Sequence, residues 1–160
     1  MANTTFSGPV RSENGFQTIV KSSTTGDVTN TMTFSQYTAT VTVADGQTTG
    51  KESAIGIPAN FIPMGVIVAV TGAASNAVNL VDIGTDADPD GFVDGITAAV
   101  NSTGFKGFFP CNGVLGMSGG ATTASTATPD EVEVVLGGDP GADTTVVLKF
   151  IGISASSDDS

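Results

Sequence analysis

Two segments of this chain follow a period of two, with strict apolar/polar alternation in the first, and this pattern constrains the fold more than any other feature. The first is the clearest part of a strand expected over residues 31–44, whose apolar positions are Tyr37, Ala39, Val41 and Val43. The second spans residues 144–153, with Val146, Leu148 and Phe150 on one side. A period of two is typical of a strand with one face in a core and the other face outside it. Both segments therefore predict antiparallel β-structure.

A third segment, residues 62–85, indicates the centre of the core. Its run Val66-Ile67-Val68-Ala69-Val70 is short, apolar and rich in β-branched residues, which favours a buried strand over a helix. We expect a hairpin here, with a turn at residues 73–76 and a second strand at residues 78–83. Pro58 and Pro63 predict that residues 59–62 lie outside any central strand, because proline lacks the N–H group that a sheet needs.

Strands at short spacing, separated by turns rich in Gly, Pro and Asp, predict an all-β fold: an antiparallel β-sandwich or jelly-roll-like domain. The expected organisation is an extended N-terminal arm (residues 1–30), a β-sandwich domain (residues 31–153) and a disordered acidic tail (residues 154–160). We expect less than about a tenth of the chain to be helical, well below the usual share.

The charge of the chain excludes some classes of partner. Sixteen acidic residues face five basic ones, for a net charge of −11, and nearly all of the excess lies after Leu80. Binding to nucleic acid phosphates requires clustered Lys and Arg, so we expect no nucleic acid partner. Anionic membrane surfaces should repel the chain as well. No run approaches the ~20 apolar residues of a membrane-spanning helix, and the N-terminus does not resemble a signal peptide.

Metal and redox chemistry have few candidate residues. There is no His, and Cys111 is the single cysteine, so a Cys/His zinc site and an intrachain disulfide are both excluded. The stretch with the clearest metal-binding pattern is Asp-Ala-Asp-Pro-Asp-Gly at residues 86–91, which matches the first half of a calcium-binding loop. The glutamate that would complete the pattern is replaced by Thr97. We expect an exposed acidic turn; the alternative is a calcium site formed by Asp86, Asp88, Asp90 and Asp94.

The arm carries isolated apolar residues between turn-forming ones. They are spaced like separate anchors that could enter pockets on a neighbouring protein. The predicted contact residues, with the turn proline and the basic residue between them, are Phe6, Pro9, Val10, Arg11, Phe16 and Ile19.

The stretch Thr4-Thr5-Phe6-Ser7-Gly8-Pro9-Val10-Arg11-Ser12-Glu13-Asn14-Gly15-Phe16 resembles the opening of small virion proteins of marine tailed bacteriophages, including those that infect cyanobacteria. The later strand pattern, with the acidic loop, is similar to β-sandwich structural proteins of the same phages. The resemblance implies a capsid decoration (cement) protein. Such a protein is made in the host cytoplasm, binds the major capsid protein on the outside of the head, and forms a homo-oligomer, commonly a trimer.

Other functions stay open at this point. Another phage structural role, as a head fibre or a tail component, fits the same strand pattern. A carbohydrate-binding module usually presents Trp or Tyr to sugar rings, and this chain has no Trp and only Tyr37. An enzyme is not expected, because general acid–base chemistry has few candidate residues here. We expect no catalytic residue and no cofactor apart from the possible calcium ion.

Overall fold

The structure is a computed structural model that describes residues 17–21, 23–26, 28–52, 61–114 and 131–156 of the 160-residue chain. In these ranges all of the regular elements are strands, so the predicted all-β sandwich is confirmed. The strands are β1 (Gln17–Lys21), β2 (Val28–Val43), β3 (Thr49–Glu52), β4 (Phe61–Gly72), β5 (Asn79–Thr85), β6 (Ala98–Ala99), β7 (Gly104–Pro110), β8 (Val132–Leu136) and β9 (Thr144–Ser156).

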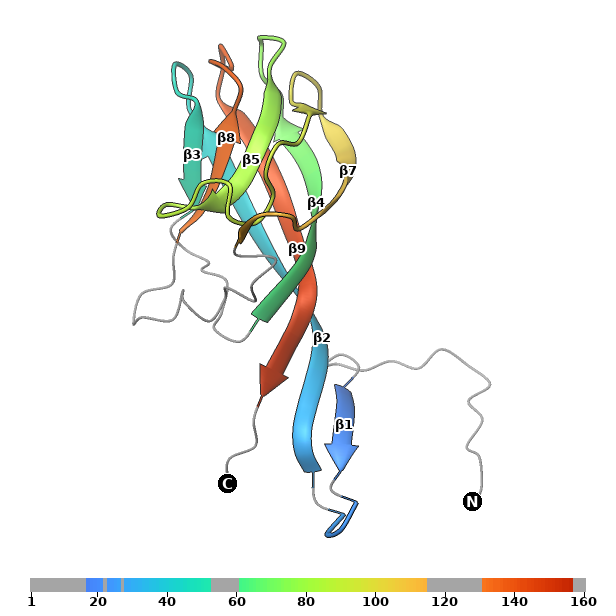
Figure 1. Cartoon of the computed structure of the whole chain (residues 1–160). Coiled ribbons are helices and arrows are strands. Elements are labelled where there is room, and N and C mark those ends of the chain that lie inside the picture. The colour runs from blue at the N-terminus through green and yellow to red at the C-terminus, as the bar shows by residue number, and fades with distance from the viewer. Residues whose placement is uncertain (1–16, 22, 27, 53–60, 115–130, 157–160) are drawn as a thin grey trace, which may run out of the picture.

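The strands form two facing antiparallel sheets (Figure 1). Sheet A has the order β1-β2-β9-β4-β7, and sheet B has the order β3-β8-β5-β6. Within them the chain folds as one long antiparallel ribbon, in which β2 pairs with β9, β3 with β8, β4 with β7 and β5 with β6. A ribbon of four such pairs wrapped around a common core is the jelly-roll topology, and β1 is an added edge strand.

The core lies between the sheets and is built from the positions that the alternation predicts. Sheet A contributes three rows of buried side chains from β2, β4 and β9: Ala39, Val41, Val43, Val66, Val68, Val70, Val146, Leu148 and Phe150. Sheet B contributes Leu80, Ile83, Val132, Val134 and Leu136. Two aromatic contacts lie at one end of this layer, where Tyr37 is opposite Phe150 in the register: Tyr37 meets Phe61 edge-on at 4.7 Å, and Phe92 meets Phe150 edge-on at 5.4 Å.

The expected hairpin over residues 62–85 is wrong. Both of its strands exist, as β4 and β5, but they lie in opposite sheets, and the connection between them crosses from one layer to the other. Ala74 is buried in this connection, and its amide donates a hydrogen bond to the carbonyl of Val100. Each apolar run instead pairs with a strand far away in the sequence, β9 for β4 and β8 for β5.

The prediction for Pro63 is also wrong, because Phe61, Ile62 and Pro63 belong to β4, the strand between β9 and β7. The proline is tolerated for a local reason. Pairing of β4 with β7 starts only at Gly65, and the register against β9 shifts between Pro63 and Gly65. The missing N–H group therefore falls at a bulge, where the ladder is interrupted anyway.

Sheet A is longer than sheet B. In Figure 1 the first half of β2, paired with β1, projects well beyond the two-layer body as a narrow ribbon. The far end of β9 accompanies it, since Ser156 pairs with Thr31. The domain boundaries that we expected, at residues 31 and 153, therefore fall inside β2 and β9.

Candidate interaction surface

The outer face of sheet A, which points away from the core, carries large apolar side chains. The strand register places Phe34 of β2, Ile153 of β9 and Ile62 of β4 in one row across the sheet. Phe34 is 56% exposed and Ile62 is 42% exposed. The outward faces of sheets in soluble proteins usually carry polar residues at such positions. This row is instead an exposed apolar strip on the side of the sheet that faces away from the core.

The strip continues along the sheet towards β7. A second row contains Lys149 of β9, Ile67 of β4 and Phe108 of β7. The ring of Phe108 lies over Gly65, in space that any side chain at Gly65 would fill. A third row ends on Phe105, whose side chain is 71% exposed. We call this surface the apolar face; its members are Phe34, Ile62, Met64, Ile67, Phe105, Phe108, Val147, Lys149, Ile151 and Ile153.

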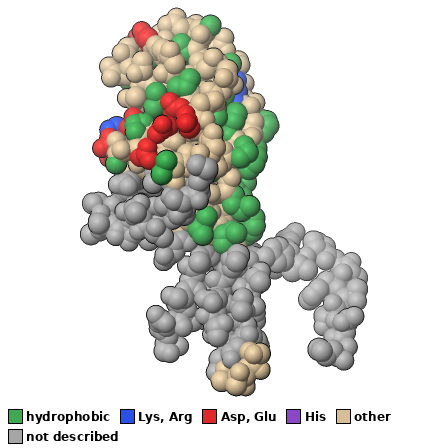
Figure 2. All heavy atoms as spheres, viewed as in Figure 1, with side chains coloured by type: hydrophobic (Ala, Val, Ile, Leu, Met, Phe, Trp, Pro, Cys, Tyr) green, Lys and Arg blue, Asp and Glu red, His purple; other side chains and the backbone are tan. Residues whose placement is uncertain are grey.

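Charge is distributed unequally between the two sheets. The five strands of sheet A contain three lysines, Lys21, Lys106 and Lys149, and no Asp or Glu. The acids of the described residues lie on the strands of sheet B and in the loops. Figure 2 shows acidic side chains gathered on the face formed by sheet B, and hydrophobic side chains along the margin formed by β4 and β7.

Part of the outer face of sheet B is covered by the chain itself. Gly84 pairs with Glu133 on this face, and a side chain at Gly84 would collide with the backbone of Asp88 and Pro89. The turn after β5 therefore folds back over the sheet, and only glycine leaves room for it. Glu133 beside the turn is 5% exposed.

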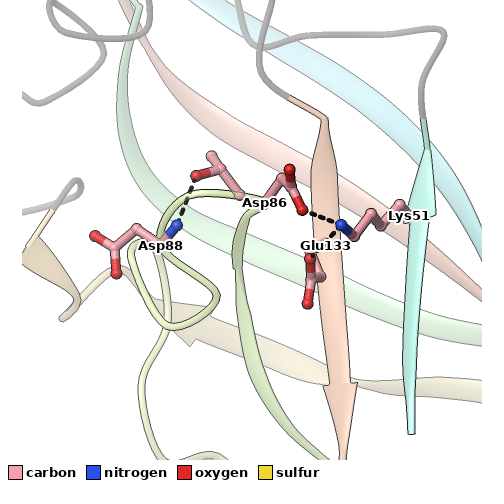
Figure 3. Close-up of polar contacts among 5 residues, drawn as sticks. Lys51, Asp86, Asp88 and Glu133 are labelled. Carbon is pink, nitrogen blue, oxygen red and sulfur yellow. Dashed lines mark hydrogen bonds and ion pairs between the residues drawn. The ribbon is translucent and has the colours of Figure 1, made fainter. Parts of the chain in front are cut away.

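An ion-pair group holds this covered face together. Lys51 of β3 is directly opposite Glu133 in the register, and its ammonium lies 3.5 Å from the Glu133 carboxylate and in contact with that of Asp86 (Figure 3). The hydrogen bond to Asp86 raises the pKa of Lys51, since it stabilises the charged ammonium. One lysine thus pairs with two carboxylates, one from the turn after β5 and one from β8, and offsets one of their two negative charges.

The predicted calcium ligands do not converge on one point. The carboxylate of Asp86 points to Lys51, whereas that of Asp88 points to the other side of the turn (Figure 3). Asp88 lies beside Asp90, and their hydrogen bond is the main reason that the pKa of Asp88 is raised, followed by desolvation and the repulsion between the two charges. In the described part of the chain, no three His, Cys, Asp or Glu residues are grouped closely enough to hold a metal ion.

Asp94 has a separate setting. Its backbone amide donates to the side-chain oxygen of Asn112 at 2.8 Å, and the Asn112 amide group donates back to the Asp94 carbonyl at 2.9 Å. This pair ties the acidic segment to the chain just after β7. Cys111, next to Asn112, is partly buried, and burial raises its thiol pKa to about 11.

The predicted arm contacts fall almost entirely outside the described residues. This applies to Phe6, Pro9, Val10, Arg11 and Phe16. Ile19 is in β1, where it pairs with Thr31.

Sequence reasoning missed the apolar face. The signal was present in the second alternating segment, where Val147, Ile151 and Ile153 occupy positions that a solvated face would give to polar residues. The exposure of Phe105 and Phe108 depends on the position of β7 at the edge of sheet A, which the sequence of a Gly-rich segment does not reveal.

Comparisons with protein-family models, with curated proteins and with solved structures give no match for this chain. In the described residues, no helix has the length and apolar character that crossing a membrane requires.

Proposed function

We propose that this protein is a structural component of a bacteriophage virion: a decoration protein that binds the outside of the assembled head as a homo-oligomer, most simply a trimer. The observation that carries the proposal is the difference between the two outer faces of the sandwich. The chain covers sheet B with its own acidic turn, whereas sheet A presents Phe34, Phe105 and Phe108 to its surroundings. Exposed apolar surface of this kind is typical of proteins that assemble with others.

The architecture supports the same proposal. Jelly rolls are frequent in viral capsid domains, although the same topology also occurs in lectins and cupins, so the fold alone does not define the function. The resemblance of residues 4–16 to phage virion proteins favours the viral role. The net charge of −11 keeps free copies apart and soluble until they reach a partner.

The carbohydrate-binding alternative receives less support from the site. Sugar rings stack on exposed Trp or Tyr rings, and Tyr37 is half-buried against Phe61. The exposed aromatic residues on sheet A are phenylalanines, which lack the hydroxyl or indole N–H group that would also bond a sugar.

Binding to heads tests the proposal directly. Heads of the phage that encodes the chain, prepared without this protein, should bind the purified full-length chain and sediment with it. A variant lacking residues 2–16 keeps β1 and the whole sandwich, and we expect it to be folded but to bind more weakly, because the arm supplies anchors such as Phe6. Burial of each such side chain contributes roughly 1.5–3 kcal/mol.

Two results would count against these expectations. If the truncated chain decorates heads as well as the full-length chain does, the arm has no role in binding. If the full-length chain neither binds such heads nor occurs on purified virions, the decoration function itself is wrong.

A further inference from the structure

We infer that the apolar face of sheet A is the surface that docks on the shell, and that its partner is a protein surface with exposed carboxylates beside apolar depressions. The inference rests on the proposed function, because it assigns a surface and a partner chemistry to the same binding event. It also separates the roles of the two sheets: sheet A faces the partner, and the acidic turn over sheet B faces solvent.

The chemistry of the partner follows from the charges on the face. Lys149 lies in the middle of the apolar rows, between Thr38 of β2 and Ile67 of β4. The strands of sheet A supply no carboxylate to pair with it. A docked surface would remove this ammonium from water, which is costly unless the partner brings an acid.

The same charges argue against a symmetric pair of copies joined through this face. A two-fold contact places the same patch on both sides. Wherever the two-fold axis lies, Lys149 of one copy would meet the strands of sheet A of the other copy, which carry no acid to neutralise it. The apolar side chains are compatible with such a pair, but the charges are not.

The size of the face leads to the same conclusion. Three to four strands at ~4.8 Å spacing and about seven residues at ~3.4 Å give a planar area of roughly 340–460 Å². A stable two-protein interface buries about 800 Å² on each partner. One face alone is therefore too small for a durable dimer, but the contact becomes strong when an oligomer makes several of them on a repeating lattice.

Two exposed residues of the face allow substitution with little effect on folding. Phe105→Ser removes a side chain that is 71% exposed, and Lys149→Gln removes the exposed charge. Each has a matched control elsewhere on the surface. Val114→Ser makes the same kind of change at a side chain that is 66% exposed, outside the strands of sheet A. Thr97→Glu also shifts the charge by one unit at an exposed position, in the loop before β6.

The experiment measures co-sedimentation of each full-length variant with shells assembled from the phage's major capsid protein. We expect Phe105→Ser and Lys149→Gln each to bind about tenfold more weakly, while both controls bind like the wild type. Binding of Lys149→Gln should also depend less on salt, because one charge contact has been lost.

The inference and the proposed function fail in different ways. If the wild type binds shells and both face variants bind equally well, the inference is wrong and the decoration function stands. If the wild type does not bind shells, both are wrong. Two further measurements test other occupants of the apolar face. If light scattering shows oligomers that Phe105→Ser dissociates, the face binds a second copy of the chain instead of the shell. If the wild type binds vesicles containing phosphatidylserine and Lys149→Gln does not, the face binds a lipid surface instead.

Discussion

The two sheets are both antiparallel, but their outer faces differ: that of sheet B is charged and partly covered by a turn, whereas that of sheet A is apolar and open. On sheet B, Gly84 lets a turn fold over the strands, and Lys51 joins Glu133 to Asp86. On sheet A, Gly65 makes room for a side chain instead of a turn, since the ring of Phe108 lies over it. No described segment of the chain covers this ring, which is half-exposed.

This difference shows where the chain covers its own sheet and where it leaves apolar side chains exposed, which is the surface that we propose for docking. On the covered face, the charge of Lys51 offsets part of the charge of Asp86 and Glu133. This face can therefore remain in water beside the acidic turn. The open face has exposed apolar side chains and Lys149, for which the strands of sheet A supply no carboxylate. The following predictions test the contrast, starting with the largest expected effect.

The two glycines provide the first test. In Gly84→Ala the new methyl group meets the backbone of Asp88 and Pro89, including the Pro89 carbonyl oxygen at 2.6 Å, and the turn cannot move without breaking its hydrogen bonds to Thr85. We expect a loss of about 3 kcal/mol in the free energy of unfolding, measured by urea denaturation.

Gly65→Ala is the matched change on the open face. Its methyl group meets the end of the Phe108 ring, which is half-exposed and can turn aside, and the Phe109 carbonyl oxygen at 3.0 Å. We expect a loss of about 1 kcal/mol. Equal losses in the two variants would mean that the open face is packed as firmly as the covered one.

The lysines provide a second, smaller test. Lys51→Met leaves the buried Glu133 without its cation, so thermal unfolding should occur at a lower temperature than in the wild type. Lys149→Met changes an exposed residue on the open face, so the unfolding temperature should stay the same while shell binding weakens. A fall in unfolding temperature for Lys149→Met alone would reverse the roles that we assign to the two faces.

The pH dependence of Lys51 has a defined sign. Its pKa is raised in the folded protein above the ordinary value of 10.5, mainly by the hydrogen bond to Asp86. The stabilisation is therefore complete below pH 10.5 and is lost as the pH rises through the folded pKa. The difference in stability between wild type and Lys51→Met should shrink over that alkaline range, and a constant difference would exclude the ion pair as its cause.

The sequence predicted the β class and most of the core, because alternation at Ala39, Val41 and Leu148 is a local signal with a simple physical cause. It did not predict that β4 and β5 lie in opposite sheets. Two apolar runs joined by a small polar linker have the same local pattern whether they form a hairpin or cross between layers. Pairing with β8 and β9, about 50 to 90 residues further along the chain, decides between the two, and this depends on long-range packing.

The site was predicted less well than the fold. The acidic turn was identified from its composition, but the contact of Asp86 with Lys51 depends on the order β3-β8-β5, which places residues 35 apart on one face. The apolar face was not predicted, because its residues come from β2, β4, β7 and β9 and only the strand register brings them together. The main anchors of the predicted arm lie outside the described residues. Surface hydrophobic residues become informative only when the strand register shows that they are neighbours.

Electron cryo-microscopy of decorated heads tests the central claim most directly, because it shows which face of the jelly roll is turned to the shell. We predict density for this protein on the outside of the head, with Phe34, Phe105 and Phe108 of sheet A at the shell and the turn at residues 86–91 in solvent. Density in which the acidic turn contacts the shell and the apolar face of sheet A is open to solvent would contradict the account.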